Sequence, residues 1–298
     1  MKKFRFKKSD AFATQNSGGN PAGYIWLDSK DDISVNKMQQ IAQELKGYVN
    51  EVGYIYKTGE NKFDLKYYSS EREVDFCGHA TIAIMYDLIK NNDNLKQYNS
   101  LKIQTNRGEL EVENRIEHEN AVFIMSPIPE VKKDIPDIDK ISMKLKIKTD
   151  EIDRSLPIMV INAGLWTLIV PIKTLKSILS IFPDFHELKE FCIDSSIDII
   201  EVFTKDAANK DHDYRTRVFA PTFGYLEDPA TGSGNSAFGY YLLENDMWDR
   251  KTIIIEQNEK IDNYNIVKLQ QKQDENKIER VLFGGGAITR IEGYYIIY

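Results

Sequence analysis

Residues 75–81 read Asp-Phe-Cys-Gly-His-Ala-Thr, and residues 228–234 repeat their design as Asp-Pro-Ala-Thr-Gly-Ser-Gly. In each stretch an acidic residue comes first, and a turn glycine with a polar neighbour then leads into an amphipathic apolar run. Superposing Gly78 on Gly232 also aligns the apolar residues that follow them. A repeat over about half of the chain predicts two similar halves.

The two glycines predict helices that begin at residues 78 and 233 and run to residues 90 and 245. The first N–H groups of a helix have no partner within it, and its N-terminal end is positive, so such ends bind anions. His79 and Ser233 lie at matched positions beside these ends. We therefore expect two helix ends that face across a cleft and bind a small carboxylate.

Strand-like runs surround both predicted helices and favour an α+β fold, in which each half is a mostly antiparallel sheet around one central helix. Further helices are expected at residues 34–46 and at 175–191, the latter interrupted near Pro183. The proline-containing segment 126–140 predicts a crossover. The expected domains are residues 1–117, joined by the terminal strand 287–298, and residues 118–286.

The composition is that of a globular protein, with 298 residues, 42% hydrophobic and 29% charged. A net charge of −7 without a basic stripe argues against nucleic acid. We find no apolar run long enough to span a membrane and no signal peptide at the start, so we expect a cytoplasmic protein. The cysteines and histidines lack metal-ligand spacing and no Gly-rich nucleotide motif occurs, so we expect no metal and no cofactor. Three histidines lie among charged residues and are expected at the surface: His118, His186 and His212.

Glu51 follows a predicted helix and begins an apolar strand. An acid at such a junction is often only solvated, and the alternative is a general base for proton transfer. His79 is the one histidine beside a turn glycine at a predicted helix start, and its repeat partner Ser233 is also polar. The matched pair favours a shared ligand.

Three other residues leave alternatives open. Asp228 either caps the helix or orients His79 or a substrate amine, and we favour the second interpretation. Cys77 is either a partly buried structural thiol or an acid–base group, which would need a lowered pKa. Asn20 either shapes the cleft wall or belongs to an ordinary Asn-Pro turn.

The chain resembles the PhzF-like proteins, the phenazine-biosynthesis isomerase family, which share the diaminopimelate epimerase fold. The matching stretches run from end to end of the chain: residues 10–12 and 19–22, Asn50-Glu51, 73–81, 217–221, 227–233, Gly285-Gly286 and Gly293. The resemblance implies two pseudosymmetric halves with the active site in the cleft between them, a homodimer, and no metal or organic cofactor.

By the same resemblance Glu51 is the catalytic proton shuttle, and His79, Asp228 and Ser233 are catalytic residues that hold the substrate and stabilise charge. Gly78 and Gly232 are expected to bind a substrate carboxylate through their backbone N–H groups. Cys77 and Asn20 complete the expected substrate-binding set.

The epimerase relatives use two opposed cysteines. Cys77 stands at the first position, but Thr231 stands at the second, and its hydroxyl is too weak an acid or base for that role. A single carboxylate moving a proton between two carbons on one face of the substrate fits better, as in the family's rearrangement of a dihydro-hydroxyanthranilate. Asn50 replaces a usual serine, and Gly234-Asn235 replaces a frequent Ala-His, so we expect an altered pocket wall.

The leading hypothesis is therefore a cofactor-independent isomerase that acts on a small cyclic or amino-acid-like carboxylate. One alternative is an amino-acid racemase or epimerase that uses Cys77. The other is a non-catalytic protein that binds small carboxylates. A hydratase or lyase that uses the same base is not distinguished by the sequence.

Overall fold

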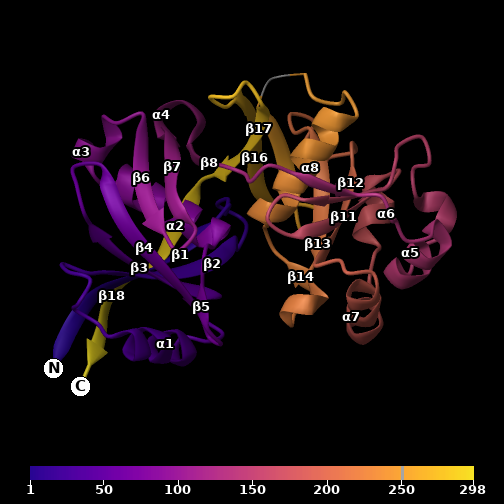
Figure 1. The fold of residues 1–298 in the computed structure, drawn as a ribbon. Coiled ribbons are helices and arrows are strands. Elements are labelled where there is room, and N and C mark those ends of the chain that lie inside the picture. The colour runs from indigo at the N-terminus through magenta and orange to yellow at the C-terminus, as the bar shows by residue number, and fades with distance from the viewer. Residues whose placement is uncertain (250–251) are drawn as a thin grey trace. The chain divides into compact units, whose positions relative to one another are not determined.

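A computed structural model describes residues 1–249 and 252–298, which form two compact units (Figure 1). Unit 1 comprises Met1–Met125 and Gly284–Tyr298, and unit 2 comprises Ser126–Phe283. Both junctions differ from the expected ones, because residues 118–125 and 284–286 belong to unit 1. The first difference arises because the strand Ala121–Met125 pairs with the strand before it.

The sheet of unit 1 wraps around one helix, α2 (Gly78–Lys90). Hydrogen-bonded neighbours run in the order β18, β1, β2, β3, β4, β6, β7 and β8, with parallel pairs at β2–β3 and β4–β6. Strands from both ends of this order, β18 and β8, contact α2, so the sheet curves around the helix. The strands are β1 (Lys2–Ala11), β2 (Asn20–Trp26), β3 (Glu51–Lys57), β4 (Lys62–Ser69), β5 (Glu73–Val74), β6 (Ser100–Thr105), β7 (Gly108–Arg115), β8 (Ala121–Met125) and β18 (Ala287–Ile297).

Unit 2 repeats this pairing pattern around α8 (Gly232–Glu244). The order is β9, β10, β11, β12, β13, β15 and β16, again with two parallel pairs, β11–β12 and β13–β15. The strands are β9 (Glu130–Lys132), β10 (Met159–Asn162), β11 (Trp166–Pro171), β12 (Ile199–Thr204), β13 (Tyr214–Phe219), β14 (Glu227–Asp228), β15 (Ile253–Gln257), β16 (Asn265–Gln273) and β17 (Glu279–Gly285), which contains the junction between the units. The predicted α+β class is confirmed.

The two central helices match closely. Each has 13 residues and begins at the glycine that the repeat singled out, one residue earlier than expected for α8. The residues before them, Cys77 and Thr231, have nearly the same extended backbone, with φ −131° and ψ 110° in one and φ −124° and ψ 116° in the other. The acidic residues do not correspond, however. The short strand β5 pairs with β4 in the same way as β14 pairs with β13. These pairings make Val74, not Asp75, the residue equivalent to Asp228 in the repeat.

Neither sheet wraps around any of the remaining helices. They are α1 (Val35–Glu44), α3 (Asp93–Lys96), α4 (Ile116–Glu119), α5 (Ile138–Leu145), α6 (Leu175–Leu179) and α7 (Phe185–Asp194), with 3-10 turns at Thr149–Glu151 and Pro221–Phe223. The break near Pro183 is confirmed. The crossover expected at 126–140 is not irregular throughout, since it contains β9 and the start of α5. Among the described residues no helix is long and apolar enough to span a membrane.

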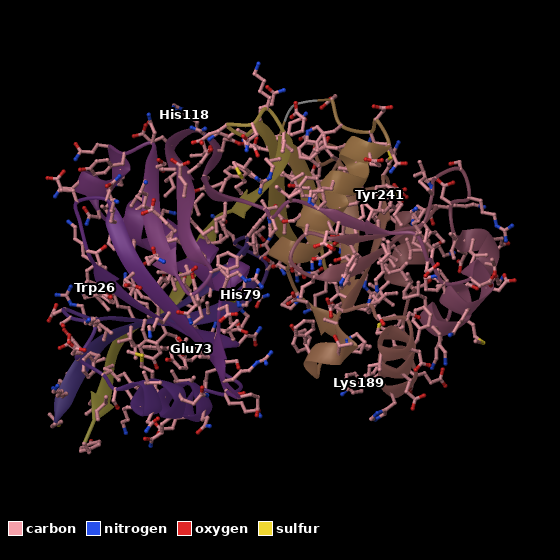
Figure 2. The ribbon with its side chains drawn as sticks, viewed as in Figure 1. Trp26, Glu73, His79, His118, Lys189 and Tyr241 are labelled. Carbon is pink, nitrogen blue, oxygen red and sulfur yellow. The ribbon has the colours of Figure 1, made fainter. Side chains whose placement is uncertain are left out.

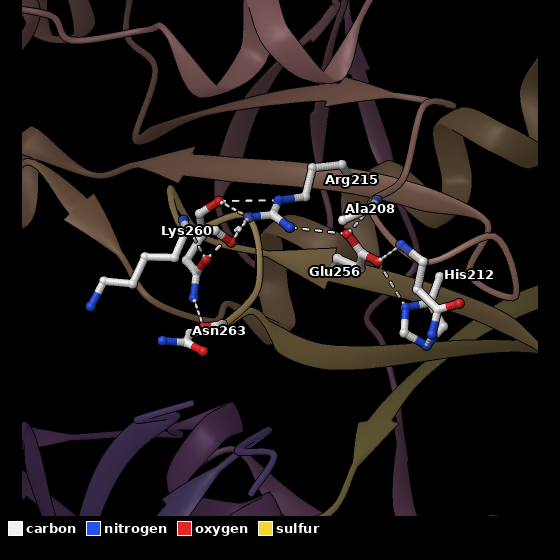
Figure 3. Close-up of polar contacts among 8 residues, drawn as sticks. Ala208, His212, Arg215, Glu256, Lys260 and Asn263 are labelled. Carbon is white, nitrogen blue, oxygen red and sulfur yellow. Dashed lines mark hydrogen bonds and ion pairs between the residues drawn. The ribbon is translucent and has the colours of Figure 1, made fainter. Parts of the chain in front are cut away.

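A buried ion pair in unit 2 ties its loops to the sheet (Figure 3). Arg215 and Glu256 are both 0% exposed, and Arg215 Nη1 lies 3.0 Å from Glu256 Oε2. Arg215 also donates to the carbonyl oxygen of Asn258, while His212 Nδ1 lies 2.9 Å from Glu256 Oε1. His212 is therefore a partly buried structural residue, and its expected surface position is wrong. Breaking one side of such a pair would leave a buried charge uncompensated, at a cost of about 3–5 kcal/mol.

Candidate active site

Glu51 is the first residue of β3, between Ala22 of β2 and Ser69 of β4. The loop in front of it is fixed from β2: Asn50 donates from its backbone N–H to Pro21 O (3.0 Å) and from Nδ2 to Asn20 Oδ1 (2.9 Å). Asn20 is only 1% exposed. The structure therefore places Asn20 as a buried support of the turn that leads into Glu51.

His79 lies in the first turn of α2 (Figure 2), and its ring contacts Glu51. His79 Nε2 lies 3.0 Å from Glu51 Oε2, with the side chains 13% and 20% exposed. Apart from this ion-pair contact, Oε2 is buried and makes no hydrogen bond to a described residue. Two residues that are distant in sequence thus meet at a place that is buried but still reachable from solvent.

Cys77 completes this cluster in unit 1. Its Sγ lies 3.5 Å from His79 Nδ1 and 3.9 Å from His79 Nε2. Burial raises the pKa of the Cys77 thiol, and the charge of Glu51 adds to that effect. Burial alone would lower the pKa of His79, but the neighbouring Cys77 and Glu51 together raise it well above its usual value. A protonated imidazole beside a carboxylate is therefore favoured.

The start of α2 is a candidate binding site for an anion. Cys77 occupies the N-cap position but makes no side-chain capping bond, and Gly78 follows as the first helical residue. The Cys77 carbonyl oxygen accepts from both the backbone N–H (3.0 Å) and the hydroxyl (2.7 Å) of Thr81, which holds the turn in place. First-turn N–H groups without a side-chain cap are the ordinary binding site for a carboxylate.

The matched residues of unit 2 form a separate polar group. Thr231 donates its hydroxyl to Asp228 Oδ2 (2.5 Å), and Asp228 is 7% exposed. Gln257 fixes this turn, because its Nε2 donates to Asp228 O (3.0 Å) and its Oε1 accepts from the Thr231 N–H (3.0 Å). Ser233 is the second residue of α8, directly after Gly232, and is partly exposed.

Sequence reasoning missed two residues of unit 2. Gln257 supports the Asp228 turn, but as one polar residue at the end of an apolar strand it gives no sequence signal. Glu201 is 0% exposed with both carboxyl oxygens unpartnered among the described residues, and burial raises its pKa well above the usual value. Gly234 and Asn235, expected on a pocket wall, are both buried; Gly234 lies beside Glu201, and Asn235 donates to Gln257 Oε1.

Chemically, the unit 1 cluster offers a carboxylate base, an imidazole able to hold a positive charge, and a helix end for an anion. Its three residues also have ligand atoms within 4.8 Å of one another, a spacing compatible with a metal ion. His118 lies in another part of unit 1, at α4 (Figure 2), and is exposed.

Comparison with known proteins gives one consistent result. The family model described as "Phenazine biosynthesis-like protein" matches residues 9–293. The curated "Uncharacterized isomerase YfhB" of Bacillus subtilis (strain 168) is 30% identical over 277 residues, covering 92% of each chain.

Solved structures agree on the fold. The Bacillus anthracis phenazine biosynthesis protein of the PhzF family has a TM-score of 0.86 at 24% identity and covers 100% of both chains. A hydroxyproline epimerase from Agrobacterium vitis, with bound trans-4-OH-L-proline, has a TM-score of 0.56 at 10% identity, over 98% of this chain and 92% of the other. The prediction of an isomerase is confirmed at the level of the class, since the curated relatives are named isomerases.

Proposed function

Because the chain belongs to the phenazine biosynthesis-like family, we propose that it is an isomerase in which Glu51 moves a proton on a small carboxylate substrate without a cofactor. The observation that supports this most is the 3.0 Å approach of His79 Nε2 to Glu51 Oε2. A base needs an acceptor oxygen that a substrate can reach and a neighbour that steadies the anion formed when the proton leaves.

In the proposed reaction the Glu51 carboxylate takes a proton from one carbon and returns it to another carbon on the same face. Between these steps the substrate carries negative charge. The imidazole of His79, whose pKa is raised, holds a positive charge beside that anion. The substrate's own carboxylate binds the N–H groups at the start of α2, around Gly78.

Asp228, Ser233 and Gly232 belong to unit 2, and we propose them as further substrate-binding groups. Asn20 has a positioning role in this proposal, because it holds the turn ahead of Glu51 through Asn50. We expect Asp228→Asn and Ser233→Ala to raise KM while leaving the Tm close to the wild-type value. That result would separate a role in substrate binding from a role in folding.

The racemase alternative is less well supported. It needs a second acid–base group opposite Cys77, and the matched position holds Thr231, whose hydroxyl already donates to Asp228. The raised pKa of Cys77 also disfavours a thiolate at neutral pH.

The test is incorporation of solvent deuterium into small cyclic and amino carboxylates, followed by NMR and mass spectrometry. Glu51→Gln should slow exchange by at least about 10²-fold, the usual contribution of a general base, while ligand-induced thermal stabilisation persists. Glu73→Gln is the matched control, since Glu73 is a partly buried carboxylate of the same unit that pairs with Asn106.

Glu51→Gln with more than a tenth of the wild-type rate would refute the assignment. Exchange at an α-carbon that is lost in Cys77→Ser and kept in Glu51→Gln would favour the racemase. Ligand stabilisation without exchange in any carboxylate would favour the binding protein.

A further inference from the structure

The cluster of Glu51, Cys77 and His79 has a property that proton transfer does not use. It joins a thiol, an imidazole and a carboxylate, and these are the three ligand types that zinc takes in proteins. All three residues belong to unit 1, and their ligand atoms lie within 4.8 Å of one another.

The spacing suits one ion. With bonds of about 2.3 Å to sulfur and about 2.0–2.2 Å to nitrogen and oxygen, tetrahedral zinc holds its ligand atoms about 3.3–3.6 Å apart. Here His79 Nε2 has Cys77 Sγ at 3.9 Å and Glu51 Oε2 at 3.0 Å. Both separations differ from the tetrahedral values by about 0.3–0.4 Å.

The polar environment points the same way. Apart from its 3.0 Å contact with His79 Nε2, Oε2 of Glu51 is buried and makes no hydrogen bond to a described residue. Cys77 is 8% exposed and the His79 side chain 13%, so the cluster is not fully closed off from solvent. A mixed sulfur, nitrogen and oxygen set selects zinc or cobalt over magnesium and calcium, which prefer oxygen alone.

We propose that Glu51, Cys77 and His79 bind a zinc-class divalent cation with one position left open, and that the bound ion inhibits the enzyme. Binding breaks the S–H bond of Cys77, forms a metal–sulfur bond and releases the thiol proton to solvent; a proton on His79 Nε2 leaves in the same way. The Glu51 lone pair is then held by the metal and cannot accept a substrate proton. The inhibitory part of this proposal rests on the proposed function of Glu51, whereas the binding part does not.

The binding experiment uses the full chain, freed of metal by a chelator and kept reduced, with Zn²⁺ in calorimetry and Co²⁺ in absorption spectroscopy. We expect one ion per chain and a cobalt spectrum with sulfur-to-metal charge transfer. Cys77→Ala should abolish that band, and Cys77→Ala or His79→Asn should weaken Zn²⁺ binding at least about tenfold, since even residues behind the ligands contribute that much in metal sites.

The matched controls are Cys192→Ala and His118→Asn. Cys192 is the other thiol, buried in the core of unit 2, and His118 is exposed on α4. Both controls should keep wild-type binding and the sulfur band. Equal Zn²⁺ affinity in Cys77→Ala and Cys192→Ala would overturn the site, as would a sulfur band that persists without Cys77.

The inhibition experiment adds one equivalent of Zn²⁺ to a turnover assay and then removes it with chelator. A reversible loss of at least about tenfold supports the proposal. Zinc-loaded enzyme with full turnover would overturn the inhibition while leaving the role of Glu51 intact. If Glu51→Gln itself proves fully active, the proposed function fails, and the zinc titration still decides the binding site.

Discussion

Gly234→Ala should destabilise the protein because of Glu201. A Cβ atom at Gly234 would lie 2.6 Å from Glu201 Oε2 and 3.3 Å from Ile199 Cδ1, and the first of these distances is too short for any real contact. Gly234 lies in the first turn of α8, and Glu201 lies below it on β12. The glycine at position 234 therefore makes room for a buried carboxyl group.

The expected size follows from two opposed effects. Overpacking a buried site costs about 1–3 kcal/mol, whereas replacing glycine with alanine in a helix returns at most about 1 kcal/mol. The free energy of unfolding should fall by about 1–2 kcal/mol, which lowers the Tm by about 2–8 °C for units of this size. Glu201→Ala removes the obstacle, so in that background Gly234→Ala should be neutral or stabilising, with a coupling energy of about 1–3 kcal/mol.

Differential scanning calorimetry of the two single variants and the double variant measures this coupling. Gly18→Ala is the control, because a Cβ atom there would meet nothing within 4 Å. If the two single effects add within about 0.5 kcal/mol, the Glu201 carboxyl does not fill the space below α8 and the reasoning is wrong.

Three further changes test other parts of the fold. Burial raises the pKa of Glu201, so the native state keeps a proton that the carboxyl group of the unfolded chain loses above about pH 4.3. The wild-type protein therefore loses stability as the pH rises above that value. Glu201→Gln should have the same Tm as the wild type at pH 4 and a higher Tm at pH 7. Gly53→Ala should lower the free energy of unfolding, measured by chemical denaturation, by about 1–3 kcal/mol, because the new Cβ would lie 2.3 Å from Ile84 Cδ1. Adding Ile84→Val, which removes that methyl group, should recover part of the lost stability. No recovery would contradict the packing. Arg217 Nη2 lies 2.7 Å from Glu227 Oε2. Arg217→Met removes this partner of Glu227 and should therefore lower the free energy of unfolding by about 3–5 kcal/mol. An effect below about 1 kcal/mol would refute a structural ion pair.

The sequence predicted the parts of the fold that have strong local signals. Both central helices were found because glycines mark their starts and apolar residues continue for more than three turns. Helix α5 was missed although Ile138, Ile141 and Leu145 have helical spacing, because the prolines before it favoured a loop. The acidic starts of the two repeated stretches are not equivalent residues, because the offset that superposes Gly78 on Gly232 sets Val74 against Asp228, and the β5 and β14 pairings agree with it.

The site was predictable only in part for a similar reason. Glu51 and His79 were named from their positions beside a strand and a turn glycine, and the structure places them in contact. Glu201 sits in an apolar strand, where nothing local distinguishes a buried acid from an exposed one. The role of Gly234 could not be predicted either, because it depends on the space that the Glu201 carboxyl group needs beside α8.

The pairing of β18 with β1 has a consequence for biosynthesis. The two strands are paired from Lys2↔Ile297 to Ala11↔Ala287, so the sheet of unit 1 needs residues from both sides of unit 2 in the sequence. Ser126–Phe283 are contiguous and can fold before residues 287–297 have been synthesised, whereas the unit that contains Glu51 and His79 is completed only once those residues are available. A chain from which β18 is deleted would thus have an open sheet edge at β1, which favours aggregation.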